Sequence, residues 1–495
     1  MAWGRGAPAG VDDLCARLQR NDATLTSLTL LAGRRFGPPE VSALAAALRD
    51  NTTLTELCAV RPLAPDGAAE LAAALQRNAT LRRLCVGDAA FGDDGVAALA
   101  PGTRRLQRLE LERKGITPIG AAALAAAMAD GELQKLSVAR NDALGDDGTA
   151  ALLAAGAGRG LQTLDAGGCG LTSRAGAALA PLLATAAQLR ALVLSDNALG
   201  PEGAPLPRPR RMQMSHACAL IPAGCAALAA GLGAARSLRE LELNDCGAGD
   251  DGAAALGSAL PGSSLARLSL ARCGVGAVGA SMLALGVERC ASLTYLCLEG
   301  NASLGDVGAC TLAAGVSAAA SAAADARLAV LDLGSCGIGV AGAVALLSAD
   351  AAASLSLLGN PCAGGADGAA LAAALTGRGR RMTHLNLSGT GLDADGGAAL
   401  AAALLAGAAP ALRTIELGAN PVRVPAALSE AKHAHATHPS RASRCSWGRR
   451  RRGRRCCRRC ASGGLTWTSP GAPRTRESRV RSANRAKRAT VSSSL

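Results

Sequence analysis

Leucine residues recur along most of the chain as Leu-x-x-Leu-x-Leu, usually with Asn or Cys three positions after the last one. The best-preserved copies begin at Leu133, Leu161, Leu189, Leu238, Leu265, Leu293 and Leu328. Weaker copies begin at Leu25, Leu54, Leu81, Leu106, Ala352, Met382 and Leu412. Apolar and polar positions alternate at the centre of the pattern, which is typical of a strand with one buried face. We therefore expect one short strand from each of these fourteen copies.

The second half of each copy has a helical period, with Leu at spacings of three and four and Ala, the best helix former, between them. Segments of this kind are 41–49, 68–76, 121–129 and 398–405. All but two successive copies begin 24 to 30 residues apart, which leaves room for one strand and one helix. Such units stack and share one core, and packed helices need about twice the spacing of paired strands. The pattern thus predicts an α/β solenoid with a concave parallel sheet and convex helices.

Several recurring motifs resemble chemical sites but keep a fixed place in the repeat. We interpret the Asn or Cys after each strand, the ladder position, as structural, because its side chain can satisfy backbone groups of a tight turn. The Asp residues of the Gly-Asp-Asp-Gly motifs and their variant, which precede helices, are interpreted as helix caps: Asp93, Asp146, Asp250 and Asp306. Three Gly-x-Gly-x-x-Gly matches, beginning at Gly247, Gly274 and Gly337, are interpreted as turns because they share one phase. We accordingly expect no enzyme activity, no cofactor, no metal and no small-molecule substrate.

The period close to 28 residues, the Asn and Cys ladder and the Gly/Asp turn before the helix resemble the ribonuclease-inhibitor class of leucine-rich repeats over about residues 11–431. That class includes ribonuclease inhibitor, the Ran GTPase-activating protein and the repeat regions of NACHT-type immune receptors. The resemblance implies a horseshoe fold, an intracellular location and protein partners. The chain lacks the aromatic-rich inner face of the inhibitor, the acidic tail of the Ran regulator and a NACHT domain. No active-site residue is therefore transferred to it.

Three domains are expected: an N-terminal capping helix in 1–24, the repeat domain in 25–432, and a basic tail in 433–495. The tail composition cannot bury a core and is typical of disorder. The 49 residues between Leu189 and Leu238 exceed one repeat by about 21, and the excess lies at 201–222, where Pro residues prevent a helix or central strand. We interpret it as an inert insertion, with a functional loop as the alternative.

The charge of the chain lies in its tail. Residues 441–495 hold 17 Lys or Arg and one acidic residue, so the rest of the chain has a net charge of −2 although the whole has +14. A basic run can attract phosphate, so nucleic acid binding through 441–495 is an alternative. The odd number of Cys residues, 17, fits a reducing compartment. With no apolar run of membrane-spanning length and no signal peptide, we expect no membrane partner and a cytoplasmic location, with the nucleus as an alternative.

Strand alternation places the residues between the leucines on the concave face, where a protein partner would bind. The predicted partner-binding residues are Arg108, Glu110, Glu112, Arg113, Lys135, Arg140, Asp165, Asp196, Glu240, Glu242, Asp245, Arg267, Arg272, Tyr295 and Glu299. Tyr295, the only Tyr, with Arg267 and Arg272 is the predicted hot spot, since Tyr and Arg often dominate binding energy. The leading hypothesis is a non-catalytic protein-interaction scaffold. The alternatives are a GTPase-activating protein resembling the Ran regulator and a nucleic-acid-associated protein.

Overall fold

Strand and helix alternate throughout the computed structural model, which describes residues 11–30, 36–197, 223–322, 328–365, 367–378, 381–421 and 466–468. The helices are α1 (Val11–Gln19), α2 (Pro38–Arg49), α3 (Pro65–Arg77), α4 (Gly92–Leu99), α5 (Pro118–Met128), α6 (Gly145–Ala157), α7 (Ser173–Thr185), α8 (Ala223–Leu232), α9 (Gly249–Ala259), α10 (Ala277–Arg289), α11 (Gly305–Ala322), α12 (Val340–Ser348), α13 (Asp367–Arg378) and α14 (Ala394–Leu405). Two short 3-10 turns, η1 (Ala100–Gly102) and η2 (Leu260–Gly262), follow α4 and α9.

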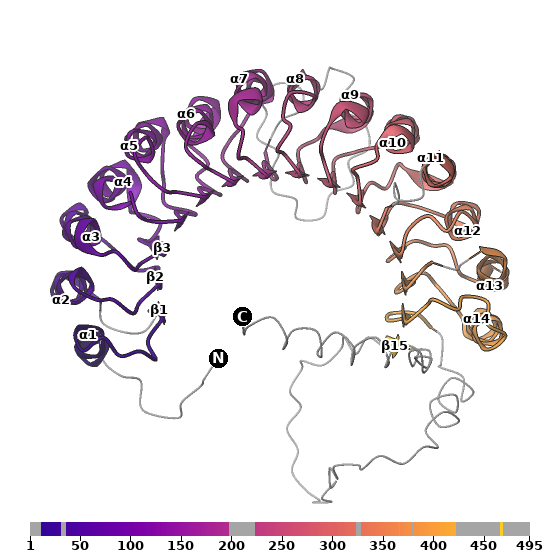
Figure 1. Ribbon diagram of the computed structural model, residues 1–495. Helices are drawn as coiled ribbons and strands as arrows, with labels where there is room; N and C mark the ends of the chain where they lie inside the picture. Colours follow the sequence, from indigo (N-terminus) through magenta and orange to yellow (C-terminus); the bar gives the residue numbers. More distant parts are fainter. Residues whose placement is uncertain are drawn as a thin grey trace, which may run out of the picture.

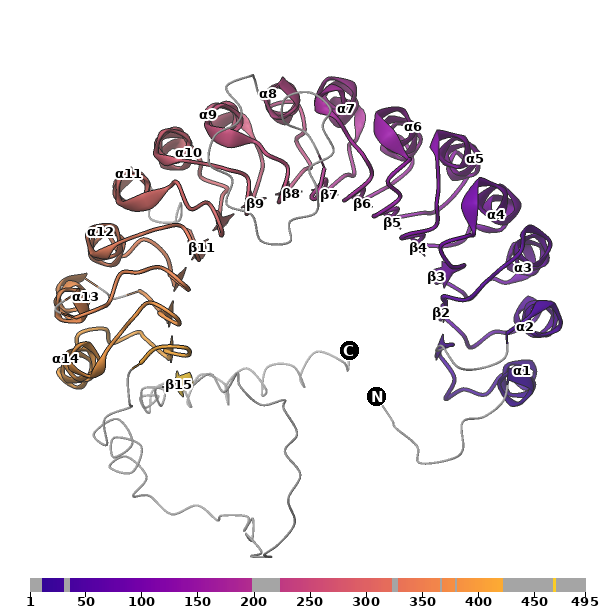
Figure 2. The ribbon, with the colours of Figure 1, turned by 180° about the vertical axis from the view of Figure 1, so that it is seen from behind.

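All strands belong to one sheet, in sequence order. They are β1 (Ser27–Thr29), β2 (Glu56–Ala59), β3 (Arg83–Val86), β4 (Arg108–Glu110), β5 (Lys135–Ser137), β6 (Thr163–Asp165), β7 (Ala191–Val193), β8 (Glu240–Glu242), β9 (Arg267–Ser269), β10 (Tyr295–Cys297), β11 (Val330–Asp332), β12 (Ser354–Ser356), β13 (His384–Asn386), β14 (Thr414–Glu416) and β15 (Thr466–Thr468). The sheet lines the inside of an arc and the helices its outside (Figures 1 and 2). The predicted fold class, an α/β solenoid with a concave parallel sheet, is confirmed.

One continuous core fills the space between sheet and helices. The second residue of each strand from β1 to β14 points into it and is at most 5% exposed. These residues share one register, as the pairing of Leu136 with Leu109 and Leu164 shows. Each layer of the core is thus built from the same leucine positions, and only neighbouring repeats need to fit one another.

The ladder position is structural, as expected. Asn301, 1% exposed, donates to the carbonyls of Leu270 (2.9 Å) and Leu298 (2.6 Å) and accepts from the amides of Cys273 and Val275 (both 3.0 Å). The thiol of Cys273 donates to the carbonyl of Leu243 at 2.9 Å. Both residue types therefore satisfy buried backbone groups of the preceding repeat.

The capping role of the Gly-Asp-Asp-Gly aspartates differs from the prediction. Asp250 lies within the first turn of α9 and accepts from the amides of Gly276 (2.6 Å) and Gly279 (2.9 Å), which belong to the start of α10. Asp93, Asp146 and Asp306 likewise bind the start of the following helix. A side chain inside the first turn no longer faces the free amides of its own helix, whereas the next repeat stacks directly beside it. Each aspartate caps its neighbour's helix.

The glycine motifs are turns, as expected, and the structure gives their reason. Gly274 has a φ of +73°, a conformation that side chains disfavour. A Cβ on Gly279 would lie 2.7 Å from Oδ1 of Asp250, so this glycine lets the cap approach. The third glycine is therefore required by packing between repeats.

The C-terminal edge of the sheet is covered by β15, which pairs antiparallel with β14. Of the predicted basic tail 433–495, the structure describes Thr466, Trp467 and Thr468, which form this strand. Thr and Trp favour strands, and the edge strand β14 offers unpaired backbone groups to them. The rest of that tail, the insertion 201–222 and residues 1–10 lie outside the described residues.

Candidate protein-binding surface

The concave face is formed by the residues that flank the buried second residue of each strand. All fifteen residues predicted to bind a partner are exposed or half-buried. In-register pairing sets them in rows across the sheet, such as Arg83, Arg108 and Lys135 on β3, β4 and β5. This row is called the basic row.

Most charge of the basic row is neutralised within the chain. Glu110 contacts both Arg83 (3.0 Å) and Arg108 (2.6 Å). Hydrogen bonding to Glu110 raises the pKa of Arg83. Within the part of the chain that is described, Lys135 alone in this row has no ion pair. The surface over β3 to β5 therefore presents little unbalanced charge.

Three carboxylates further along the face, Glu112, Asp165 and Glu242, form what we name the acidic centre. Burial raises the pKa of Asp165, and repulsion by Glu112 adds to that effect. Burial, followed by repulsion from Glu240, also raises the pKa of Glu242. No ion pair to any of the three is present among the described residues, although the hydroxyl of Ser137 donates to Glu112 at 2.9 Å and Asp165 at 3.3 Å. The acidic centre thus carries negative charge that no ion pair within the described residues balances.

Beside the acidic centre, β9 and β10 bring Arg267 and Tyr295 together. The guanidinium of Arg267 lies 4.0 Å from the centroid of the Tyr295 ring, and its Nε donates to Glu240 at 2.8 Å. Arg272 instead binds Asp245 through two nitrogens at 2.7 and 2.9 Å. The predicted hot spot of three residues is therefore a contacting pair, with Arg272 engaged elsewhere at the turn.

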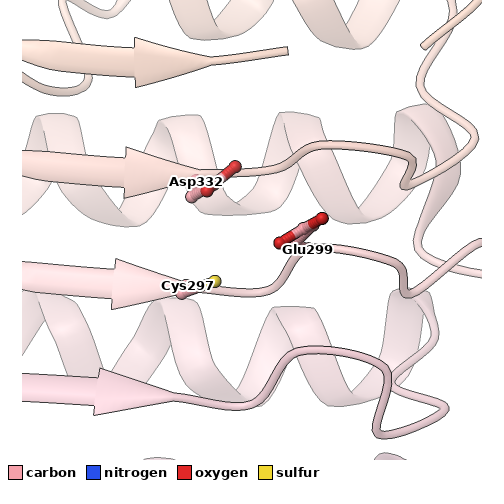
Figure 3. A group of neighbouring side chains, drawn as sticks. All are labelled: Cys297, Glu299 and Asp332. Carbon is pink, nitrogen blue, oxygen red and sulfur yellow. The ribbon is translucent and has the colours of Figure 1, made fainter. Parts of the chain in front are cut away.

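Two more residues lie next to Tyr295 on the face: Asp332, which strand alternation also predicts there, and Cys297, which the predicted site did not include. The sulfur of Cys297 and one carboxylate oxygen each of Glu299 and Asp332 all lie within 4.8 Å of one another (Figure 3). Burial raises the pKa of the Cys297 thiol, which favours the neutral form, so the group presents mainly two carboxylates. Strand alternation could also have found Cys297, because it occupies the last position of β10. Arg267, Tyr295, Cys297, Glu299 and Asp332 are together called the Tyr295 patch.

The predicted residues Arg113, Arg140 and Asp196 line the turns after the strands. Arg140 contacts Asp196 at 3.7 Å, across one intervening repeat. All three have a positive φ, between 57° and 62°. They lie at the rim of the concave face.

No helix within the described ranges is long and apolar enough to cross a membrane.

Comparison with known proteins supports the repeat assignment. A family model described as Leucine Rich repeat matches residues 77–100, 188–204, 234–257, 328–347 and 381–401. No curated protein matches the chain. The crystal structure of the Rad7 and Elc1 complex in yeast is similar at 16% identity and a TM-score of 0.45, over 82% of this chain and 87% of that chain. This likeness is too distant to support any inference about partners, and membership of the ribonuclease-inhibitor class stays a prediction. The segments that match the family model, together with a sheet built from one strand in every repeat, show that the chain is a leucine-rich repeat protein.

Proposed function

We propose that this protein is a non-catalytic interaction scaffold that binds a protein partner on its concave face, over the acidic centre and the Tyr295 patch. The observation that carries the proposal is the set of three half-buried or exposed carboxylates of the acidic centre without an ion pair in the described chain. Solenoids use their extended concave surfaces for binding. A partner segment bearing Lys or Arg would supply the missing charge.

The Tyr295 patch would supply a more specific contact. Tyr and Arg are enriched among the residues that dominate interface energies, and here the two stack. The neighbouring carboxylates of Glu299 and Asp332 extend the negative surface of the acidic centre across β10 and β11. A basic partner segment with an apolar or aromatic side chain would therefore match this part of the face.

The convex surface offers weaker anchors. Its exposed large apolar side chains include Ile119, Val278 and Val307, which lie on three different helices, α5, α10 and α11. Single apolar side chains of this kind are normal on protein surfaces.

Affinity purification with charge-reversed variants tests the proposal. Proteins captured by the wild-type chain are compared with those captured by the double variant Glu112→Lys/Glu242→Lys and by Glu70→Lys, an exposed acid of the convex helix α3. We expect partners to be lost with the double variant and retained with Glu70→Lys. Equal capture by all three proteins would contradict binding at the acidic centre. Unchanged affinity of a purified partner for Tyr295→Ala would exclude the Tyr295 patch.

The two alternative functions, a GTPase-activating protein and a nucleic-acid-associated protein, would give different results in the same experiment. Stimulated GTP hydrolysis by a captured GTPase would favour the GTPase-activating protein. Capture that is removed by nuclease, and lost on truncation before residue 441, would favour the nucleic-acid-associated protein.

A further inference from the structure

Two cysteines lie next to each other on the concave face near its N-terminal end. Cys58 on β2 and Cys85 on β3 are register partners in adjacent parallel strands. Neither is in a disulfide; Cys58 is half-buried and Cys85 is 9% exposed. As register partners in paired strands, both side chains lie on the same face of the sheet.

Their backbone spacing suits a covalent bond. Register partners in paired strands lie about 4.8 Å apart, within the range of about 4.4 to 6.8 Å that disulfides span between Cα atoms. The other cysteine on this row, Cys297, has Ser269 and Asp332 as its register partners. Cys58 and Cys85 are therefore the pair of this row, among the described strands, that can bond without a change of register.

A buried cation lies beside the pair. Lys114, 3% exposed, occupies a ladder position where most repeats have Asn or Cys, and its ammonium donates to the carbonyl of Gly87 at 2.8 Å. Burial lowers the pKa of Lys114, while its attraction to Cys85 and Cys58 opposes that shift. Burial and Cys58 raise the pKa of Cys85 to about 12, and Lys114 acts in the opposite direction. Lys114 thus places a positive charge close to the pair and partly opposes the effect of burial on Cys85.

We propose that Cys58 and Cys85 are a reactive thiol pair, which a small-molecule disulfide such as glutathione disulfide oxidises to an intramolecular disulfide between β2 and β3. The Cys58 thiolate, the more exposed of the two, attacks one sulfur of glutathione disulfide and releases the first glutathione. The Cys85 sulfur then attacks the mixed disulfide at Cys58 and releases the second. Two protein thiols and one glutathione disulfide become one protein disulfide and two glutathione thiols, which take up both protons.

The ladder cysteines provide an internal comparison. Cys169, Cys246, Cys273 and Cys336 are at most 1% exposed, and their thiols donate to backbone carbonyls of the preceding repeat. Burial raises the pKa of all four. Because all four are more buried than Cys58, we expect them to react more slowly than Cys58 in the folded protein.

Mass spectrometry of the full chain tests the proposal. The native protein is incubated with glutathione disulfide, quenched in acid, alkylated and digested, and peptides joined through Cys58 and Cys85 are quantified. We expect this joined peptide in wild type and in the control variant Cys297→Ser. In Cys85→Ser, which lacks the second thiol, Cys58 should instead accumulate the glutathione adduct.

The opposite pattern would overturn the proposal. A wild-type protein that keeps glutathione on Cys58 without forming the joined peptide, or forms it only in urea, shows that the two sulfurs do not bond in the folded state. Phenylarsine oxide, which binds two neighbouring thiols at once, is a probe that needs no variant. It should protect both cysteines from alkylation together, and protection of neither would contradict the pair.

Discussion

The ladder turns and the concave face lie a few residues apart in every repeat, yet they treat polar groups in opposite ways. At the ladder, Asn301 is fully buried and each of its polar atoms is bonded to backbone. On the face, Glu242 is half-buried with no ion pair in the described chain, and Asp165 is similar. The ladder side chains satisfy buried backbone groups and so stabilise the fold, whereas these carboxylates of the face carry charge that no ion pair in the described residues balances. If the proposed function is correct, stability and binding depend on different positions of each repeat.

The largest expected effect comes from removing a ladder side chain. Asn301→Ala leaves two amides and two carbonyls of the buried turn without their side-chain partner, which costs about 3 kcal/mol of unfolding free energy or more. Asn386→Ala removes the same residue type from the face, where its side chain accepts one bond, from the amide of Ser388 at 2.9 Å, and should cost about 1 kcal/mol. Urea unfolding monitored by circular dichroism measures both. Equal losses of unfolding free energy in the two variants would show that the ladder position contributes no more to stability than the face.

A reversal of charge in the acidic centre should affect binding rather than folding. For a partner that wild type captures, Glu112→Lys/Glu242→Lys should weaken affinity by about 2 kcal/mol, roughly thirtyfold in Kd, because attraction becomes repulsion. Titration calorimetry measures the affinity and urea unfolding the stability. If the variant lost stability as Asn301→Ala does, the face would be part of the fold and not a separate surface.

An intermediate effect on stability is expected at the caps between repeats. Asp250→Ala frees the amides of Gly276 and Gly279 at the start of α10, and should cost about 1 to 2 kcal/mol. The adjacent Asp251, which is exposed, gives the matched control Asp251→Ala, with a loss below about 0.5 kcal/mol. Thermal unfolding compares the two. A larger loss for Asp251→Ala would mean that the caps are assigned to the wrong residue.

The smallest effect is a dependence of stability on pH. The folded-state pKa of Glu242 is raised, so its charged form destabilises the fold above that pKa, and the penalty disappears as pH falls and the group is protonated in both states. Glu242→Gln should therefore be more stable than wild type at pH 7, by less than about 1 kcal/mol for this partly solvated group, and equal to it near pH 4. Urea unfolding at the two pH values checks the sign. A variant less stable than wild type at pH 7 would show that Glu242 has a stabilising partner.

The repeating features of the molecule could be predicted from the sequence because every layer imposes the same requirement. The strands, their register and the buried leucines follow from one spacing. Features that depend on the contact between two repeats were harder to predict from the sequence. Asp250 looks like a cap of its own helix when only its local sequence is considered, and it becomes a cap of α10 once the stacking is known.

On the concave face, too, contacts between neighbouring repeats could not be predicted from the sequence. Alternation placed Arg267 and Tyr295 on the face, but their contact depends on the pairing of β9 with β10. Arg272 was grouped with them by its spacing, and the turn directs it to Asp245. The sequence has Cys58 and Cys85 at the same position of two successive repeats, but only the strand register shows that they are direct neighbours.

The caps between repeats also give the solenoid a direction. At the four places where an aspartate caps the next helix, the bond runs from the N-terminal repeat to the C-terminal one. Loss of a repeat from the C-terminal end leaves the remaining helices capped, whereas loss from the N-terminal end exposes the amides of the first helix that stays. Shortened forms of this protein, whether made by proteolysis or by deletion in a gene, should therefore tolerate loss at the C-terminal end more readily.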